Sequence, residues 1–272
     1  MSRYKSAADQ RKTQASRGAA IKLGLVALVL VALVVTYFQT LGSRRTLDEE
    51  TLCPADPDSL TILVVDVTDP MNLPQRQDFT NQLERLRSSI PRYGKLAIYK
   101  VDAQSEKLLT PVIERCNPGT AADASEWTGN PASLAKKWDE QFKLPLDRAF
   151  TQISSASGAE RSPILESVQS VALTQLQTPD ADGKPKKLII ASDLLQNTSR
   201  LSFYGQLPDP DAVVASPAFR TVRTDLRGVD VELWMLQRED SSQSQPRSLI
   251  DLWDNMLSEM GATVQRQYTV SG

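Results

Sequence analysis

The sequence of 272 residues contains no histidine. This absence excludes Ser-His-Asp and Cys-His nucleophile pairs and the usual zinc sites, because each of them needs an imidazole. Any catalysis would have to use carboxylates, lysine or a bound metal. Cysteine is nearly absent too: Cys53 and Cys116 make up neither a CxxC redox pair nor a four-thiolate metal site. One disulfide is the most that they can form.

Clustered positive charge is also missing from most of the chain. The net charge is -2, and basic residues gather only near the N-terminus. Binding to phosphate backbones needs a clustered basic surface, so we expect no nucleic-acid partner. The composition, 40% hydrophobic and 24% charged, is that of a globular protein, and the length allows one large or two small domains.

One long apolar run, from Ile21 to Phe38, is interrupted only by Lys22. It has about the length needed to cross a bilayer, and it predicts a transmembrane helix at residues 21–40 that serves as a membrane anchor. A buried helix of a soluble core is disfavoured, since the run is not amphipathic and ends in two aromatic residues. A cleaved signal peptide is the stronger alternative. The following "TYFQTLGS" offers no good small-x-small cleavage site, which favours a retained anchor.

Charge on either side of the run predicts its orientation. The basic residues before or at its start, opposed only by Asp9, are Arg3, Lys5, Arg11, Lys12, Arg17 and Lys22. After it, Arg44 and Arg45 are soon balanced by acidic residues. The positive-inside rule therefore predicts a single-pass protein of the cytoplasmic (inner) membrane, with its N-terminus inside and its C-terminal domain periplasmic or extracellular. In that oxidising compartment a Cys53–Cys116 disulfide is expected, the alternative being two unrelated buried thiols.

The predicted organisation follows from these signals. Residues 1–20 form a basic cytoplasmic tail, 21–40 the transmembrane helix, 41–59 a polar linker, and 60–272 one α/β domain with an inserted loop at about 103–130. Within the domain, apolar runs predict strands at "LTILVVD", "KLAIYKV", "KKLIIASD" and "VDVELWML", and "TVQRQYTV" is a candidate for an edge strand that closes the sheet. Helical spacing between them, including a helix with Ser162 as N-cap before Pro163, predicts an open, mostly parallel, doubly wound Rossmann-like sheet with helices on both faces.

Polar residues follow two of these strands. Asp66 ends the first strand, with Thr68 and Asp69 just beyond it, and Asp193 ends "KKLIIASD". Ser162, before the preceding helix, is expected at the same edge, because sites in such sheets form at the carboxyl ends of strands. Carboxylate and hydroxyl oxygens are hard ligands that suit Mg²⁺ or Mn²⁺. The alternative is that both aspartates only hydrogen-bond turn amides.

These residues, in this order, resemble the von Willebrand factor A (VWA) family, whose metal-ion-dependent adhesion site has a DxSxS motif, a later threonine and a final aspartate. The resemblance covers about residues 60–270 and implies a VWA-like domain with metal ligands at Asp66, Thr68, Ser162 and Asp193. The motif is degenerate. Pro70 replaces its third hydroxyl, and "SDLLQN" stands at the second aspartate. Cofactors are thus either none, or Mg or Mn at a degenerate site.

In the VWA family a carboxylate from the partner completes the cation site, whereas the degenerate motif favours metal-independent contact through the same face. We therefore expect partner contact at Asp69, Pro70, Leu194 and Gln196. The proline-bearing stretch "LPDPDAVVASP" from Leu207 is expected to be a loop near this face.

The leading interpretation is a non-enzymatic, membrane-tethered protein-binding module, an accessory subunit of a bacterial envelope or mobile-element-encoded assembly. The main alternative is a metal-dependent phosphoesterase that uses Asp66, Asp69 and Asp193 as ligands. It lacks histidine and a well-spaced general base. A haloacid-dehalogenase phosphotransferase would need a second aspartate where Thr68 stands, and a periplasmic solute sensor would need an apolar pocket.

Overall fold

This computed structural model describes residues 22–37, 45–66, 68, 70–101, 103, 108–124, 130–154, 161–238 and 245–270. The chain divides into two compact units, Met1–Thr46 and Leu47–Gly272. The predicted basic tail, residues 1–20, lies outside the described residues.

The first unit contains a helix over residues 22–37. Its large apolar side chains are exposed, for example Leu23 at 72% and Tyr37 at 61%. Among the described residues, no helix is both long enough and apolar enough to cross a membrane. The ends of the predicted span, residue 21 and residues 38–40, lie outside the described part of the chain.

The second unit is built on a six-stranded sheet in the order β3-β2-β1-β4-β5-β6. Five strands run parallel to their neighbours, and β3 pairs with β2 in the antiparallel direction. The strands are β1 (Leu60–Val65), β2 (Lys95–Lys100), β3 (Ile113–Cys116), β4 (Lys186–Ser192), β5 (Val229–Leu236) and β6 (Thr263–Val270). The sheet is open and mostly parallel, as the sequence predicts, and its two central strands, β1 and β4, are adjacent.

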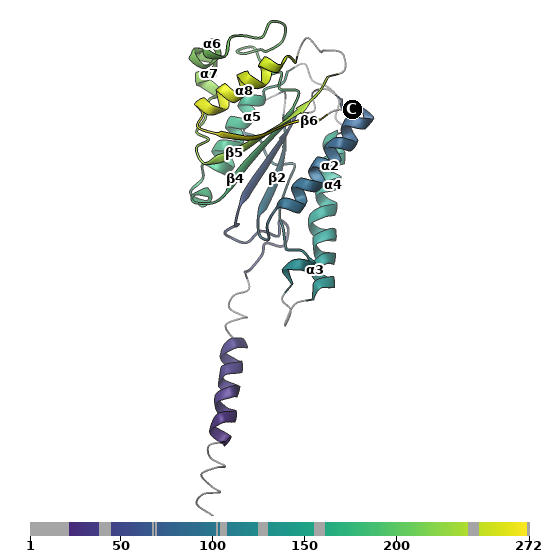
Figure 1. The fold of residues 1–272 in the computed structure, drawn as a ribbon, viewed down its shortest axis with the longest axis vertical. Coiled ribbons are helices and arrows are strands. Elements are labelled where there is room, and N and C mark those ends of the chain that lie inside the picture. Colours follow the sequence, from purple (N-terminus) through teal and green to yellow (C-terminus); the bar gives the residue numbers. More distant parts are fainter. Residues whose placement is uncertain are drawn as a thin grey trace, which may run out of the picture. The chain divides into compact units, whose positions relative to one another are not determined.

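Helices cover both faces of the sheet (Figure 1). One face carries α5 (Ile164–Val171) continuing into the π-helical turn η3 (Ala172–Leu176), then α6 (Pro210–Ala215), α7 (Pro217–Val222) and α8 (Arg247–Glu259). The other carries α2 (Leu73–Ser89) and one continuous helix made of α3 (Pro131–Lys137), the π-helical turn η2 (Trp138–Lys143) and α4 (Leu144–Ser154). Two short 3-10 turns, η1 (Ala121–Asp123) and η4 (Pro179–Ala181), lie in connections.

Alternate residues of the central strands supply both cores. In β1, Ile62 and Val64 point to the α5 face, whereas Leu63 and Val65 point to the α2 face. All six β1 residues are buried, as expected of a strand covered on both sides. On the α2 face the Phe79 ring stacks on Phe150 with 4.7 Å between centroids. Burial of such side chains contributes roughly 1.5–3 kcal/mol each.

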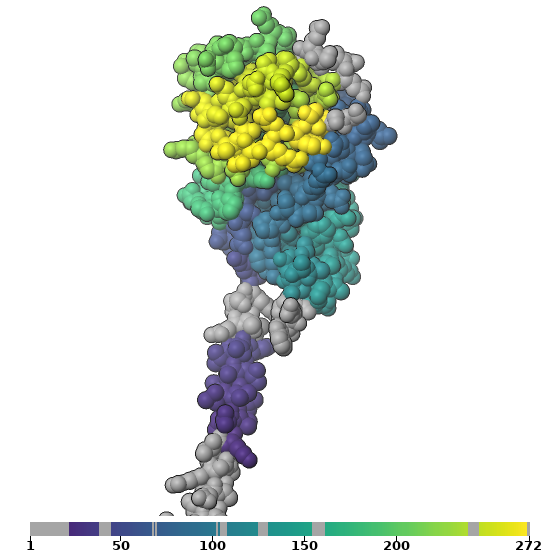
Figure 2. Space-filling view, in the orientation of Figure 1, coloured from purple at the N-terminus to yellow at the C-terminus, as the bar shows by residue number. Residues whose placement is uncertain are grey.

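The free edges of the sheet are β3 and β6. Figure 2 shows β6 and α8, in yellow, beside α2, in blue, on one face of this unit. The Tyr268 hydroxyl of β6 donates to Asp78 of α2 over 2.7 Å, which ties the edge strand to the helix.

Two segments differ from the sequence predictions. The predicted inserted loop at 103–130 contains β3, which was missed because its residues IERC are mostly half-buried and show no apolar alternation. The stretch from Leu207, predicted to be a loop, contains α6 and α7. Asp209 and Ser216 cap these helices, and each is followed directly by a proline, which is a helix-start signal rather than a loop signal.

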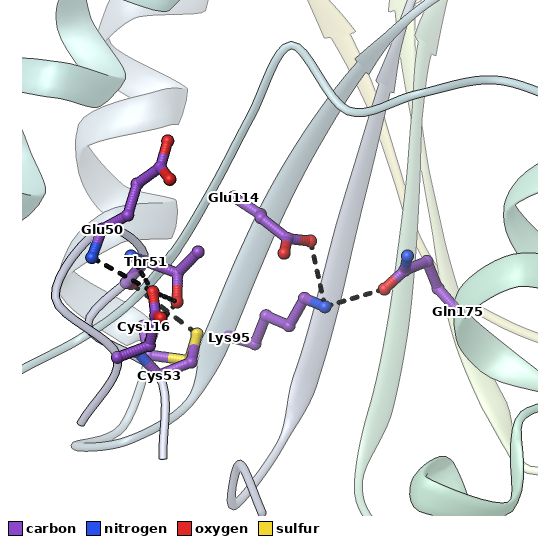
Figure 3. The surroundings of a disulfide bond; sticks show 8 residues. Glu50, Thr51, Cys53, Lys95, Glu114, Cys116 and Gln175 are labelled. Atoms are coloured by element: carbon purple, nitrogen blue, oxygen red, sulfur yellow. Dashed lines mark hydrogen bonds and ion pairs between the residues drawn. A yellow bond between two sulfur atoms is a disulfide. The ribbon is translucent and has the colours of Figure 1, made fainter. Parts of the chain in front are cut away.

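The Cys53–Cys116 disulfide is present, with the two Cα atoms 4.7 Å apart (Figure 3). It joins the segment before β1 to the last residue of β3. Beside it, the Cys116 amide donates to the Thr51 carbonyl over 2.9 Å, and Leu52 is 4% exposed. The compact unit therefore begins at Leu47, earlier than the predicted boundary at residue 60, because the disulfide and these contacts hold the end of the predicted linker against the sheet.

Candidate functional site

The strand-end cluster, which we define as Asp66, Ser162, Ser192, Asp193 and Arg238, lies at the carboxyl edge of the sheet. Register explains its first members: Val65 of β1 is paired with Ala191 of β4, so the next residues, Asp66 and Ser192, are neighbours. The Asp66 amide donates to the Ala191 carbonyl over 2.8 Å, continuing the ladder by one step. The first four residues are at most 5% exposed.

Asp66 is held by one amide and two hydroxyl groups. Its Oδ1 accepts from the Thr68 amide over 3.0 Å. Its Oδ2 accepts from Ser162 Oγ over 2.5 Å and from Ser192 Oγ over 3.1 Å. Hydrogen bonds to a carboxylate are charge-assisted and strong, so three donors stabilise the buried negative charge. The structure thus brings together Asp66 and Ser162, as predicted, and adds Ser192.

Asp193 is paired with an arginine. Its Oδ1 accepts from the Leu195 amide over 2.9 Å, and its Oδ2 accepts from Arg238 Nε over 2.6 Å. The side chains of Asp193 and Arg238 are 6% and 22% exposed, respectively. Arg238 also donates to the Tyr204 hydroxyl over 2.7 Å and lies over the Tyr204 ring at 5.3 Å from its centroid. The second carboxylate of the cluster is therefore neutralised from within the chain.

The segment that carries Arg238 follows β5, the strand next to β4. Its backbone is positioned by Gln245, whose Oε1 accepts from the Arg238 amide over 2.8 Å. Gln245 Nε2 donates to the carbonyls of Asp193 and Leu236, each over 2.9 Å. Arg238 was not predicted as a site residue, although its position two residues beyond a predicted strand placed it at the same edge as Asp66 and Asp193.

Ser162 does not act as the N-cap that the sequence predicted. Its hydroxyl is used by Asp66, and the helix start is capped by Gln196 instead. Gln196 Oε1 accepts from the Leu165 amide over 2.9 Å, and Gln196 Nε2 donates to Glu166 Oε2 over 2.8 Å. The Ser162 hydroxyl bonds the buried Asp66 carboxylate instead of the helix amides, and Gln196, from the loop after β4, supplies the helix cap.

The predicted partner-binding residues fall into two groups. Pro70 is exposed, and Asp69 lies outside the described residues. Leu194 and Gln196 have no exposed surface. Leu194 adopts a left-handed backbone conformation (φ 63°), and its carbonyl accepts from Trp253 Nε1 over 2.8 Å. These two residues hold the loop in shape, and a partner would meet their neighbours rather than their side chains.

A divalent cation does not fit the cluster as it stands. Such a cation needs oxygen lone pairs that converge on one open point. Here Ser162 Oγ lies 2.5 Å from Asp66 Oδ2, and Ser192 Oγ lies 3.1 Å from Asp66 Oδ2 and 3.3 Å from Asp193 Oδ1. These hydroxyls bond the carboxylates directly, and Arg238 holds Asp193. Thr68, the remaining predicted ligand, is buried, and its backbone amide donates to Asp66 Oδ1. Within the described residues, no group of three or more acidic, histidine or cysteine side chains is arranged to hold a metal.

The same geometry bears on the phosphoesterase alternative. That reaction would need Asp66 and Asp193 to share a metal, together with Asp69. The two described aspartates instead accept from hydroxyls, amides and Arg238. No observation in the described residues favours it.

Comparison with known proteins gives structural similarity without a family assignment. No protein-family model and no curated protein matches the chain. Among solved structures, conserved hypothetical protein BatB from Bacteroides thetaiotaomicron is 10% identical, with a TM-score of 0.38, 79% of this chain covered and 91% of the other. An aerotolerance-related membrane protein from Bacteroides fragilis NCTC 9343, carrying multiple mutations to serines, is 10% identical, with a TM-score of 0.34 and coverages of 79% and 92%. Similarity at this level supports nothing about function.

Proposed function

We propose that this protein is a membrane-anchored, VWA-like protein–protein interaction module without enzymatic activity, and that its partner binds the carboxyl edge of the sheet without a metal. The observation that carries the proposal is the Arg238–Asp193 pair beside Asp66, whose carboxylate is held by one amide and two hydroxyl groups. The Arg238 guanidinium is a cation from within the chain, and it pairs with Asp193, the residue that the VWA resemblance implied as a metal ligand. The edge is then a rigid surface that recognises a partner by shape and charge.

The position of the chain entrance supports this choice of face. Cys116 pairs with Lys95 at the start of β2, and Lys95 pairs with Leu60 at the start of β1. The disulfide therefore holds residues near Cys53 at the amino edge of the parallel strands. Within this unit, the strand-end cluster lies at the opposite edge from the point where the chain enters, and exposed Pro70 beside the buried cluster offers surface to a partner.

The anchor in this proposal is the segment at residues 21–40, with the N-terminus in the cytoplasm and the disulfide-bonded domain in the periplasm or outside the cell. Three features support it: the exposed apolar side chains of the helix over residues 22–37, the basic residues that precede it, and a disulfide of the kind that persists in oxidising compartments. An accessory subunit of a bacterial envelope or mobile-element-encoded assembly is the role that matches these features.

Site-specific photo-crosslinking in the host membrane tests the proposal. A photoreactive residue at exposed Pro70 reports on the strand-end face, and one at Lys136, whose side chain is 72% exposed, serves as the control away from it. We expect one protein to be crosslinked from position 70 but not from position 136, with the same yield in EDTA. Crosslinks only from position 136, no crosslink from either position, or loss of the crosslink in EDTA would contradict the proposal.

A further inference from the structure

A groove of about 490 Å³ lies beside the strand-end cluster, on the face of the sheet covered by α5. Its lining comes from α5, η3, the loop after β4, the end of α7 and Leu108. Two large apolar side chains in it are exposed, Leu108 at 62% and Leu173 at 51%. Leu173 belongs to the π-helical turn η3, where its neighbour Ala172 is completely buried. π-Helical turns often occur at functional sites.

Two arginines, Arg161 and Arg200, also line the groove. Both are exposed, and neither forms a hydrogen bond or ion pair with any residue that the structure describes. Among the lining residues that the structure describes, Glu166 alone carries a carboxylate, and it already accepts from Gln196 Nε2 over 2.8 Å. The groove thus combines exposed apolar surface with two guanidinium groups that have no partner within the part of the chain that the structure describes.

The backbone that carries these arginines is held in place. Arg161 directly precedes Ser162, which exchanges two backbone hydrogen bonds with Asn197, of 3.0 and 2.8 Å. Arg200 lies in the turn that follows, closed by a 2.9 Å bond from the Thr198 amide to the Leu201 carbonyl. Since Ser162 also bonds Asp66, the groove and the strand-end cluster share one rigid support.

We propose that this groove binds an acidic segment of the protein partner. An apolar side chain of that segment packs on Leu108 and Leu173, and flanking Asp or Glu carboxylates pair with Arg161 and Arg200. A guanidinium presents parallel N–H groups that match a carboxylate, and an apolar contact beside it excludes water from the pair. This inference rests on the proposed function. It adds that the partner presents an acidic segment and that the groove is the surface that binds it.

Selection from a displayed library of random nine-residue peptides tests this inference, with the full chain in lipid nanodiscs as bait. We expect the wild type to enrich peptides that carry Asp or Glu next to a large apolar residue. The most enriched peptide should bind Arg161→Glu/Arg200→Glu at least about tenfold more weakly. The control, Arg76→Glu/Arg148→Glu, makes the same charge change at exposed arginines of α2 and α4 and should bind it as the wild type does.

Leu173→Ser provides a second variant, and it should also weaken binding, because it removes apolar contact without changing charge. No enrichment over empty nanodiscs would overturn the inference. So would selected peptides that bind the Arg161→Glu/Arg200→Glu variant as tightly as the wild type. Neither outcome would contradict the proposed function, because that function is tested by the crosslinking experiment at Pro70. The groove inference and the proposed function can therefore fail independently.

Discussion

Arg238 Nε donates to Asp193 Oδ2 over 2.6 Å, which places an arginine from the end of β5 on a carboxylate from the end of β4. The Asp193 side chain is 6% exposed, so loss of the guanidinium would leave an uncompensated buried charge. The pair is thus the main electrostatic support of the strand-end cluster.

Replacement of Arg238 should therefore destabilise the domain. We expect Arg238→Met to lower the free energy of unfolding by about 3 kcal/mol, measured by urea denaturation. Asp193→Asn added to Arg238→Met should restore much of the loss, because the buried charge is then gone. Arg148→Met, at an exposed arginine, is the control and should change stability little. If Arg238→Met behaved like Arg148→Met, Asp193 would not depend on the arginine.

Gln196 should matter more for stability than a loop glutamine normally does. Its side chain has no exposed surface, caps the Leu165 amide and bonds Glu166. Gln196→Leu should cost about 1–3 kcal/mol, since it leaves a buried amide without an acceptor. Gln77→Leu, on the exposed surface of α2, is the matched control and should be nearly neutral. Equal effects of the two changes would contradict the capping role.

Loss of the disulfide should loosen the segment before β1. Cys53→Ser/Cys116→Ser opens a link between residues 63 apart in sequence, which corresponds to about 4 kcal/mol in the chain-entropy model. Thermal unfolding with and without dithiothreitol measures this. The wild type should melt at a lower temperature in reductant, whereas the double variant should not respond. A wild type insensitive to full reduction would show that the linker contacts suffice alone.

Tyr99 gives a pH dependence at the alkaline end. Burial, with the Glu114 carboxylate as a lesser cause, raises the pKa of Tyr99 from 10.0 to about 12. The unfolded chain releases this proton before the folded protein does, so the stability contributed by this group falls as pH rises from 10 to 12. Tyr99→Phe should show a shallower loss over that window in urea unfolding. An identical slope in both proteins would contradict the shift.

Strands with strong local signals were predictable from the sequence. β1, β4 and β5 appear where apolar and β-branched runs predict them, because burial on the sheet faces imposes that pattern. β3 was missed because an edge strand with half-buried residues needs no such run. α6 and α7 were missed for another reason: their prolines suggested a loop, while each proline follows a capping residue at a helix start.

The candidate site was predictable only in part. Asp66, Ser162 and Asp193 meet at one edge because parallel strands bring their carboxyl ends together. The hydrogen bonds that each of these side chains forms depend on residues that are distant in the sequence. Ser162 bonds Asp66 instead of capping its helix because Gln196 supplies the cap. Arg238 carries no motif of its own, and its role follows only from the adjacency of β4 and β5.

The most direct test of a metal-independent strand-end cluster is thermal unfolding of the full chain in detergent, first in EDTA and then in Mg²⁺ or Mn²⁺. A ligand that binds only the folded state raises the melting temperature by mass action. We predict the same melting temperature in all three conditions, because Arg238 already holds Asp193 and two hydroxyls already hold Asp66. A rise in Mg²⁺ or Mn²⁺ that disappears in Asp66→Ala would show that a cation binds there, and would contradict the account.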